Sequence, residues 1–225
     1  MPKLKPETQT LRRDHILDVA ERCFARAGFH RTTMHDICRE ASVSPGALYV
    51  YFDSKEALIE GLCERDRTLL AERVGTLSAA PDFLTALRTL GSHIFIEEPA
   101  HKRLFVAEMA VESTRNPRIA AIYQAADAFS LASFEALFER LMASGRIAPG
   151  LDPAKVARVF HLVGEGLQWR RAVDPKFDFD DVRDALFTMI ERLLNPQLPA
   201  DLSAATSVKE APRATLKRAK SEVTS

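Results

Sequence analysis

The chain has 225 residues, a length that suits one or two domains, and its 46% hydrophobic content is enough for a sizeable core. Lys and Arg together number 31, as do Asp and Glu, so the chain as a whole is not basic, although this does not exclude a local basic patch. Because it contains no apolar run of about 18 residues and no apolar segment near its start, we expect neither a membrane span nor a secretory signal. Three cysteines without metal-ligand spacing favour a reducing compartment, so we expect a cytoplasmic protein. Cys23 and Cys38 are expected to fill the core, with redox sensing as the alternative.

The first ten residues, 1–10, are polar, contain two prolines and are predicted to form a disordered arm. A helix is expected from about residue 11 to 27, where apolar residues recur at helical spacing, and Gly28 is its natural C-cap. Arg12 and Arg13 open this helix. They are interpreted either as a solvated helix start or as part of an arm that touches phosphate or the minor groove.

The stretch 33–55 has the pattern of two short helices joined by a tight turn. Thr33 is a good N-cap, and Asp36 three residues later completes a capping box. Ser44 caps the second helix, whose first position is Pro45, where no amide donor is needed. A helix of about two turns buries little by itself, but it can project from a scaffold into the major groove of DNA. The alternative interpretation is that this helix pair is only structural.

The sequence of this stretch resembles a known family. The segment SPGALYVYFDSKEAL is similar to the recognition-helix signature of TetR-family transcriptional regulators, and the preceding ILDVAERCFARAGFHRTTMHDICREASV is similar to the family's first two helices. The resemblance is specific from about Leu11 to Leu62. It implies an all-α fold, with an N-terminal three-helix helix-turn-helix DNA-binding domain at 11–54 and a C-terminal helical domain for ligand binding and dimerisation.

The resemblance also implies roles for particular residues. Phosphates would be held by Thr33, Tyr49, Tyr51 and Lys55. The groove would be faced by Ser44, Pro45, Gly46, Ala47 and Val50. Family members often have Lys or Asn at the positions of Pro45 and Ala47, so base contacts in this protein would be mostly apolar.

The remaining chain shows no strand signal, and we expect a helical effector-binding and dimerisation domain at 55–195. Its first helix is predicted from Lys55 to about Val74, because Gly75 marks a break. The other helices are predicted at 81–98, from Pro99 onward, at 117–144, at 153–173 and from about 180 to 195. A disordered basic tail is predicted at 196–225.

The C-terminal half carries polar side chains set among apolar ones, which is the usual composition of a ligand pocket. The candidate effector-binding residues are Phe105, Glu108, Met109, Tyr123, His161, Glu165 and Trp169, each with ordinary packing as the alternative. His161 and Glu165 lie four apart on one helix face, and His93, Glu97 and His101 form a looser set. Because neither set has a third well-spaced ligand, no metal site and no cofactor are predicted.

No catalytic or nucleotide-binding motif is present, so we do not expect an enzyme. The favoured function is a DNA-binding transcriptional regulator, by resemblance more often a repressor, that a small-molecule effector releases from its operator. The alternative is a cytosolic helical binding protein or enzyme. We also predict a homodimer on a palindromic operator, formed through the helix at 153–173 and the last helix. Gly164 and Gly166 would allow a partner backbone to come close.

Overall fold

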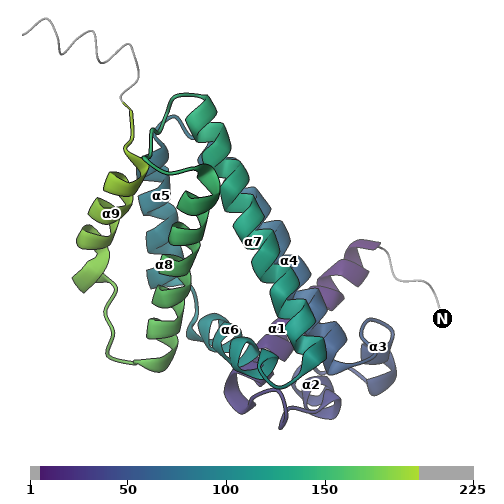
Figure 1. The fold of residues 1–225 in the computed structure, drawn as a ribbon. Helices are drawn as coiled ribbons and strands as arrows, with labels where there is room; N and C mark the ends of the chain where they lie inside the picture. The colour runs from purple at the N-terminus through teal and green to yellow at the C-terminus, as the bar shows by residue number, and fades with distance from the viewer. Residues whose placement is uncertain (1–5, 198–225) are drawn as a thin grey trace, which may run out of the picture.

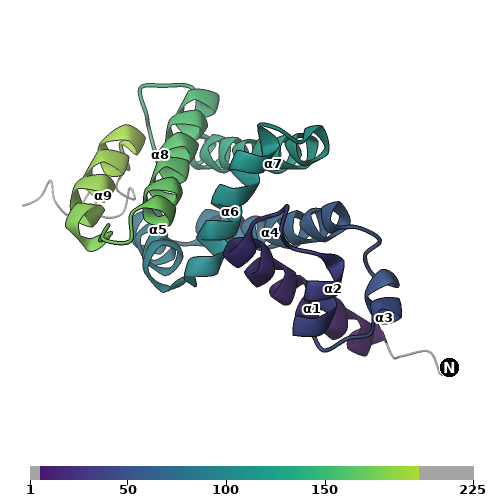
Figure 2. The ribbon, with the colours of Figure 1, turned by 90° about the horizontal axis from the view of Figure 1, so that it is seen from below.

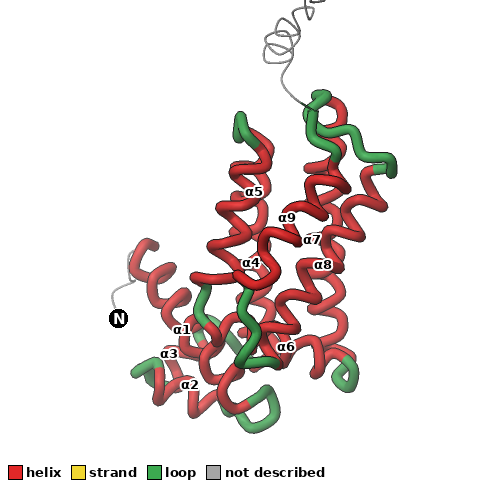
Figure 3. Tube along the Cα trace, turned by 90° about the vertical axis from the view of Figure 1, so that its left-hand side faces the viewer, coloured by secondary structure: helices red, strands yellow, loops and turns green. Residues whose placement is uncertain are grey.

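The computed structural model describes residues 6–197, and the regular secondary structure in this range is entirely helical (Figures 1 and 3). The predicted all-α fold is therefore confirmed. The predicted basic tail at 196–225 lies almost wholly outside the described residues, as do residues 1–5 of the predicted arm. Residues 6–10 of that arm are helical, which corrects the prediction. The reason is that Pro6 is tolerated in a first helical turn, where Glu7 also complements the helix dipole.

The helices follow one another with short connections. In chain order they are α1 (Pro6–Ala27), α2 (Met34–Glu40), α3 (Pro45–Tyr49), α4 (Lys55–Ala79), α5 (Phe83–Ser92), the π-helical turn η1 (His93–Glu97), α6 (Ala100–Ser113), α7 (Pro117–Ala143), α8 (Pro153–Val173) and α9 (Asp180–Leu194). The helices α1, α2 and α3 gather at one end of the molecule, while the long α4 and α7 run side by side (Figure 1). The helix α6 lies between α1 and α8 (Figure 2).

The cap signals in the sequence are confirmed. The Thr33 hydroxyl accepts a hydrogen bond from the Asp36 N–H at 3.1 Å, and the Asp36 carboxylate accepts one from the Thr33 N–H at 3.2 Å. Ser44 caps α3, and Ser54 caps α4 by accepting from the Ala57 N–H at 3.1 Å. Each such cap is worth about 1 kcal/mol. These caps fix where the short helices of the DNA-binding domain begin.

Two helix boundaries differ from the sequence prediction. The helix α4 continues through Gly75 to Ala79, because Val74 and Leu77 are buried in the C-terminal core, and their burial outweighs the roughly 1 kcal/mol cost of a helical glycine. The helix predicted at 81–98 ends at Ser92 and continues as η1, where the Glu98 N–H donates to the His93 carbonyl at 3.1 Å. Such π-helical turns insert one extra residue and often lie at functional sites.

The hydrophobic core has two parts. The N-terminal part surrounds Phe24, and it includes Phe105 and Met109 from α6 and Ile119 from α7. The C-terminal part lies between α4, α5, α7, α8 and α9. Since α6 contributes side chains to the N-terminal core, the DNA-binding helices and the C-terminal domain share one packed interface.

Candidate DNA-binding surface and effector cavity

The helix α3 exposes the residues that the resemblance assigned to DNA. Its buried anchor is Leu48, followed by the buried Phe52, whereas Tyr49 and Val50 are 52% and 78% exposed. Exposed residues of the predicted set also include Thr33, Ser44, Pro45 and Gly46, and the half-buried ones are Ala47, Tyr51 and Lys55. A face with small side chains and two tyrosine hydroxyls is suited to close approach to a DNA backbone.

Close packing fixes the position of α3. Phe52 lies against Gly61 of α4, where a Cβ atom would stand only 2.9 Å from the Phe52 ring. The guanidinium of Arg13 lies 5.4 Å from the centre of the same ring. The turn before α3 passes through Ser42 at φ 54°, in the left-handed region that non-glycine residues rarely adopt. The recognition helix is therefore held by α1 and α4 together.

Lys55 has a different environment from the other predicted phosphate ligands. Its ammonium donates a hydrogen bond to the Phe29 carbonyl at 2.5 Å and lies 4.2 Å from the centre of the Phe29 ring. Burial lowers the pKa of Lys55. In this structure the Lys55 side chain thus connects the start of α4 with the link between α1 and α2.

The same link is held from its other side by α6. The Phe29 N–H donates to the Glu108 carboxylate at 2.8 Å, and His30 pairs with the fully buried Glu112 at 3.1 Å. Gly28 has φ 79°, and a Cβ atom there would lie 2.9 Å from Glu108, so the left-handed backbone and the close carboxylate both require glycine. We call Lys55, Glu108 and Glu112 the link clamp.

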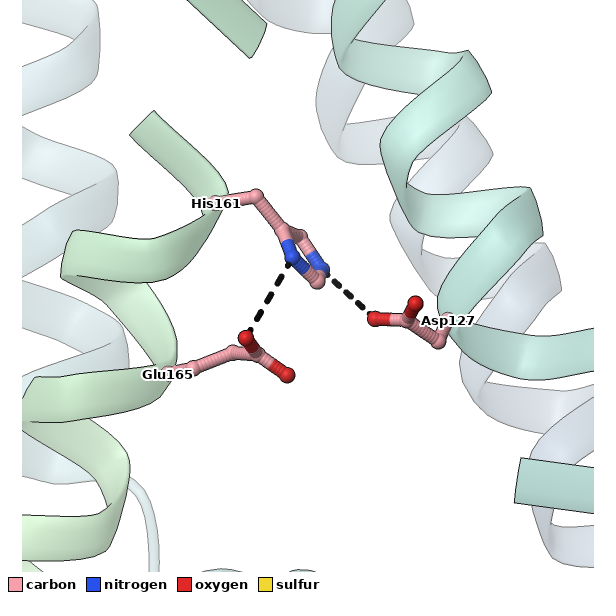
Figure 4. A group of neighbouring side chains, drawn as sticks. All are labelled: Asp127, His161 and Glu165. Carbon is pink, nitrogen blue, oxygen red and sulfur yellow. Dashed lines mark ion pairs between the residues drawn. The ribbon is translucent and has the colours of Figure 1, made fainter. Parts of the chain in front are cut away.

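A cavity of about 650 Å³ lies between α4, α5, α6, α7, α8 and α9. Its wall is mostly aliphatic, and the aromatic side chains in it are Phe95, Tyr123, Phe134, Phe160, Trp169 and Phe187. Among its charged lining residues, Arg73 is neutralised by Glu98 at 2.6 Å. His161 and Glu165 stand at the α7–α8 side, next to Asp127 (Figure 4). Such an apolar cavity with a few convergent polar groups is typical of a small-molecule site.

The structure divides the predicted effector residues into two groups. Tyr123, His161, Glu165 and Trp169 line the cavity. The other three, Phe105, Glu108 and Met109, lie on the opposite face of α6, where they contact the DNA-binding domain. The second predicted polar set is also divided, since His93 pairs with Glu97 at 2.8 Å, without His101.

Comparisons with known proteins agree with this geometry. Residues 16–62 match the family described as bacterial regulatory proteins, tetR family, and residues 95–195 match the C-terminal domain of BetI-type transcriptional repressors. The HTH-type transcriptional regulator UidR of Escherichia coli K12 is 30% identical over 161 residues, which cover 71% of this chain and 80% of UidR. This chain belongs to the TetR family. It is a DNA-binding transcriptional regulator, so the alternative of a helical enzyme or binding protein with purely structural N-terminal helices is set aside.

Solved structures of TetR-family regulators share the fold. GusR of Salmonella enterica is 30% identical, with a TM-score of 0.66 over 85% of this chain and 98% of GusR. SmeT in complex with triclosan is 26% identical, with a TM-score of 0.68 over 80% of this chain and 90% of SmeT. The similarity therefore extends over both the helix-turn-helix domain and the cavity-bearing domain.

TetR-family regulators act as dimers, and this protein has an exposed apolar surface on its last two helices. On α8 only Val156 and Ala157 are buried within one chain. The exposed apolar side chains of the two helices are Val159, Leu162, Trp169, Val173 and Met189. Gly164 and Gly166 have no neighbouring atom within 4 Å of an added Cβ.

Sequence reasoning missed Glu112 and Asp127. Glu112 pairs with His30 of the α1–α2 link as well as with Arg115 of its own segment, and Asp127 lies beside His161 of another helix. The contact that gives each residue its interest therefore comes from a distant part of the chain. None of the helices between residues 6 and 197 is long and apolar enough to cross a membrane.

Proposed function

We propose that this TetR-family regulator is a homodimeric, cytoplasmic repressor of a palindromic operator, and that a small, largely apolar effector lowers its operator affinity. The observation that carries the proposal is the position of α6. One of its faces lines the cavity, and its opposite face holds the α1–α2 link through Glu108 and Glu112.

On the DNA side, the exposed face of α3 enters the major groove. Ser44, Pro45, Gly46, Ala47 and Val50 face the bases, so the readout is mostly apolar contact and shape. Tyr49 and Tyr51 donate hydrogen bonds to phosphates, whereas the hydroxyl and the N–H of Thr33 both already donate to Asp36 within the capping box. Lys55 is assigned to the link clamp, because its ammonium is already engaged by Phe29.

On the effector side, a ligand that fills the cavity displaces the cavity-facing residues Val106, Ala107 and Ala110 of α6. The helix then moves the carboxylates on its other face, and with them the α1–α2 link. A ligand that prefers the DNA-incompetent arrangement shifts the population away from DNA. A coupling of 1–3 kcal/mol, which is typical of allosteric proteins, corresponds to about 5–150-fold in operator affinity.

For the dimer, we assign the interface to the exposed apolar faces of α8 and α9. Gly166→Glu tests this assignment, because the open space around Gly166 lets a single chain accept the side chain without a clash. The variant should be a folded monomer near 25.1 kDa in light scattering, whereas the unmodified protein should be a dimer. Gly75→Glu on α4, another helical glycine with open surroundings, is the matched control and should remain dimeric. A dimeric Gly166→Glu protein would place the interface elsewhere.

The coupling is tested with a filled cavity. Ala107→Phe should occupy the space beside α6 and abolish the response of operator binding to ligand. Because this side chain fills the same space as the ligand, operator affinity without ligand should fall toward that of the ligand-bound protein. Triclosan, which is bound in the SmeT structure, is a suitable first probe, and Trp169 fluorescence reports its binding. If an effector binds equally well to free and operator-bound protein, the C-terminal domain serves only for dimerisation, and the regulatory part of the proposal is wrong.

A further inference from the structure

Three side chains with metal-binding chemistry meet at the edge of the cavity. Asp127 comes from α7, and His161 and Glu165 come from one face of α8, as Figure 4 shows. One nitrogen or oxygen atom from each side chain lies within 4.8 Å of the atoms from the other two. Asp127 is the third ligand that the His161–Glu165 pair lacks in the sequence pattern.

One imidazole nitrogen and one oxygen from each carboxylate are close enough together to reach one ion, and the side chains form no hydrogen bonds with one another. His161 Nε2 lies 3.6 Å from Asp127 Oδ1, and His161 Nδ1 lies 3.6 Å from Glu165 Oε2. Both distances are too long for hydrogen bonds. The two carboxylates face opposite nitrogens of the ring, and one ion binds only one of these nitrogens. An ion at Nε2, beside Asp127, is therefore completed by the exposed Glu165 side chain only when this side chain turns toward Nε2.

The charges of this cluster are not neutralised by neighbouring cations. Within residues 6–197, neither Asp127 nor Glu165 forms an ion pair with Lys or Arg. The His161 side chain is only 16% exposed and its ring lies 6.1 Å from Phe134, so it is held in place, whereas the two carboxylates are 43% and 44% exposed and accessible to an ion.

A comparison within the chain shows what is special here. His93 and Glu97 have the same spacing of four residues, but their atoms are 2.8 Å apart and form a direct pair on the exposed side of η1. No third ligand joins them within the described range. At His161 a carboxylate from a second helix joins the pair, which brings three candidate ligands together.

We propose that Asp127, His161 and Glu165 bind a divalent transition-metal ion of the Mn²⁺ to Zn²⁺ series, with water completing the coordination. One imidazole with two carboxylates is a borderline-hard ligand set that suits these ions. Because two of the ligands line the cavity, the ion would stand beside the effector and offer it an open coordination position. Metal binding itself does not depend on the regulatory role proposed above, and it is measured without DNA.

The test is a titration of tag-free, chelator-treated full-length protein with Co²⁺, followed by visible absorption and calorimetry. One Co²⁺ per chain should bind. Asp127→Asn and His161→Gln should each weaken binding at least about tenfold, since even an outer partner of a metal site contributes 10–100-fold. Glu139→Gln, an exposed carboxylate on the same helix α7, and His93→Gln should bind Co²⁺ like the unmodified protein.

A second readout uses the unmodified protein and does not depend on how the variants fold. Trp169 follows Glu165 by four residues on α8, so bound Co²⁺ should quench its fluorescence, and Zn²⁺ should displace Co²⁺ and restore it. Absence of Co²⁺ uptake at millimolar concentration would overturn the proposal. So would uptake that persists unchanged in a folded Asp127→Asn protein, because the site would then lie elsewhere.

Discussion

Replacing Lys55 with Gln separates two roles for this residue, an anchor of the α1–α2 link and a phosphate ligand. The ammonium lies 2.5 Å from the Phe29 carbonyl oxygen and 4.2 Å from the centre of the Phe29 ring. Glu108 holds the N–H of the same residue at 2.8 Å. Both polar groups of one backbone residue are thus bound by charged side chains from different helices, which is expected for an anchor.

The size of the effect follows from these contacts. A hydrogen bond to a charged group contributes about 1.5–3 kcal/mol, and a cation–π contact at a partly exposed site adds roughly 0.5–1 kcal/mol. Burial lowers the pKa of Lys55, which means that desolvation of the ammonium offsets part of this gain. We expect Lys55→Gln to lower the free energy of unfolding by about 1–2 kcal/mol.

The assay combines urea unfolding at a fixed protein concentration with operator binding at several salt concentrations. If Lys55 is an anchor, the unfolding midpoint falls and the salt dependence of operator binding is unchanged. If Lys55 holds a phosphate, the midpoint stays and the slope of log K against log salt falls by about 0.9. Tyr49→Phe is the control, because Tyr49 is exposed and its loss should weaken DNA binding without altering stability or salt slope. A normal midpoint with a reduced slope in Lys55→Gln would refute the anchor role.

Two further predictions concern titrating side chains. Burial raises the pKa of the Cys23 and Cys63 thiols to about 11. Iodoacetamide at neutral pH should therefore alkylate both thiols about 100-fold more slowly in the native protein than in urea. Rapid alkylation of the native protein would instead support a redox-sensing role. Burial, and then the charge of Arg22, lowers the pKa of His101 from its ordinary 6.5. The folded state therefore favours neutral His101. The stability that this contributes is present above pH 6.5 and is lost as the pH falls through the folded-state pKa. His101→Gln should therefore reduce the loss of melting temperature between pH 7 and 5, whereas replacement of the exposed His35 by Gln should not. Equal acid sensitivity of the two variants would contradict a contribution of His101 to the acid destabilisation.

Local signals in the sequence were sufficient for the DNA-binding domain. The capping box at Thr33, the Ser44–Pro45 start of α3 and the glycine at residue 28 depend on chemistry within a few residues, and the structure confirms all three. The extension of α4 through Gly75 could not be predicted in the same way. It depends on burial of Val74 and Leu77 against helices far along the chain.

The sequence predicted a pocket in the C-terminal half, and four of its seven candidate residues line the cavity, while their role in effector binding stays a prediction. The helices that line the cavity have inward faces that can be recognised from the spacing of their apolar residues. The candidates on them that line the cavity are Tyr123, His161, Glu165 and Trp169. Asp127 was missed because its significance comes from His161 on a different helix. The residue spacing within one helix contains no information about a pair formed between two helices, such as Asp127 with His161.

The helix α6 shows why the other three candidates, Phe105, Glu108 and Met109, lie away from the cavity, and why their position bears on function. Its residues at 105, 108, 109 and 112 form one stripe at helical spacing and contact the DNA-binding domain, while those at 103, 106, 107 and 110 form another and face the cavity. A helix buried on two sides gives no single amphipathic direction, so the sequence could not assign each stripe to its partner. Because the two stripes belong to one rigid helix, a ligand cannot displace the cavity stripe without also moving the carboxylates that hold the α1–α2 link. The ambiguity in the sequence and the proposed coupling of cavity to DNA therefore have the same structural origin.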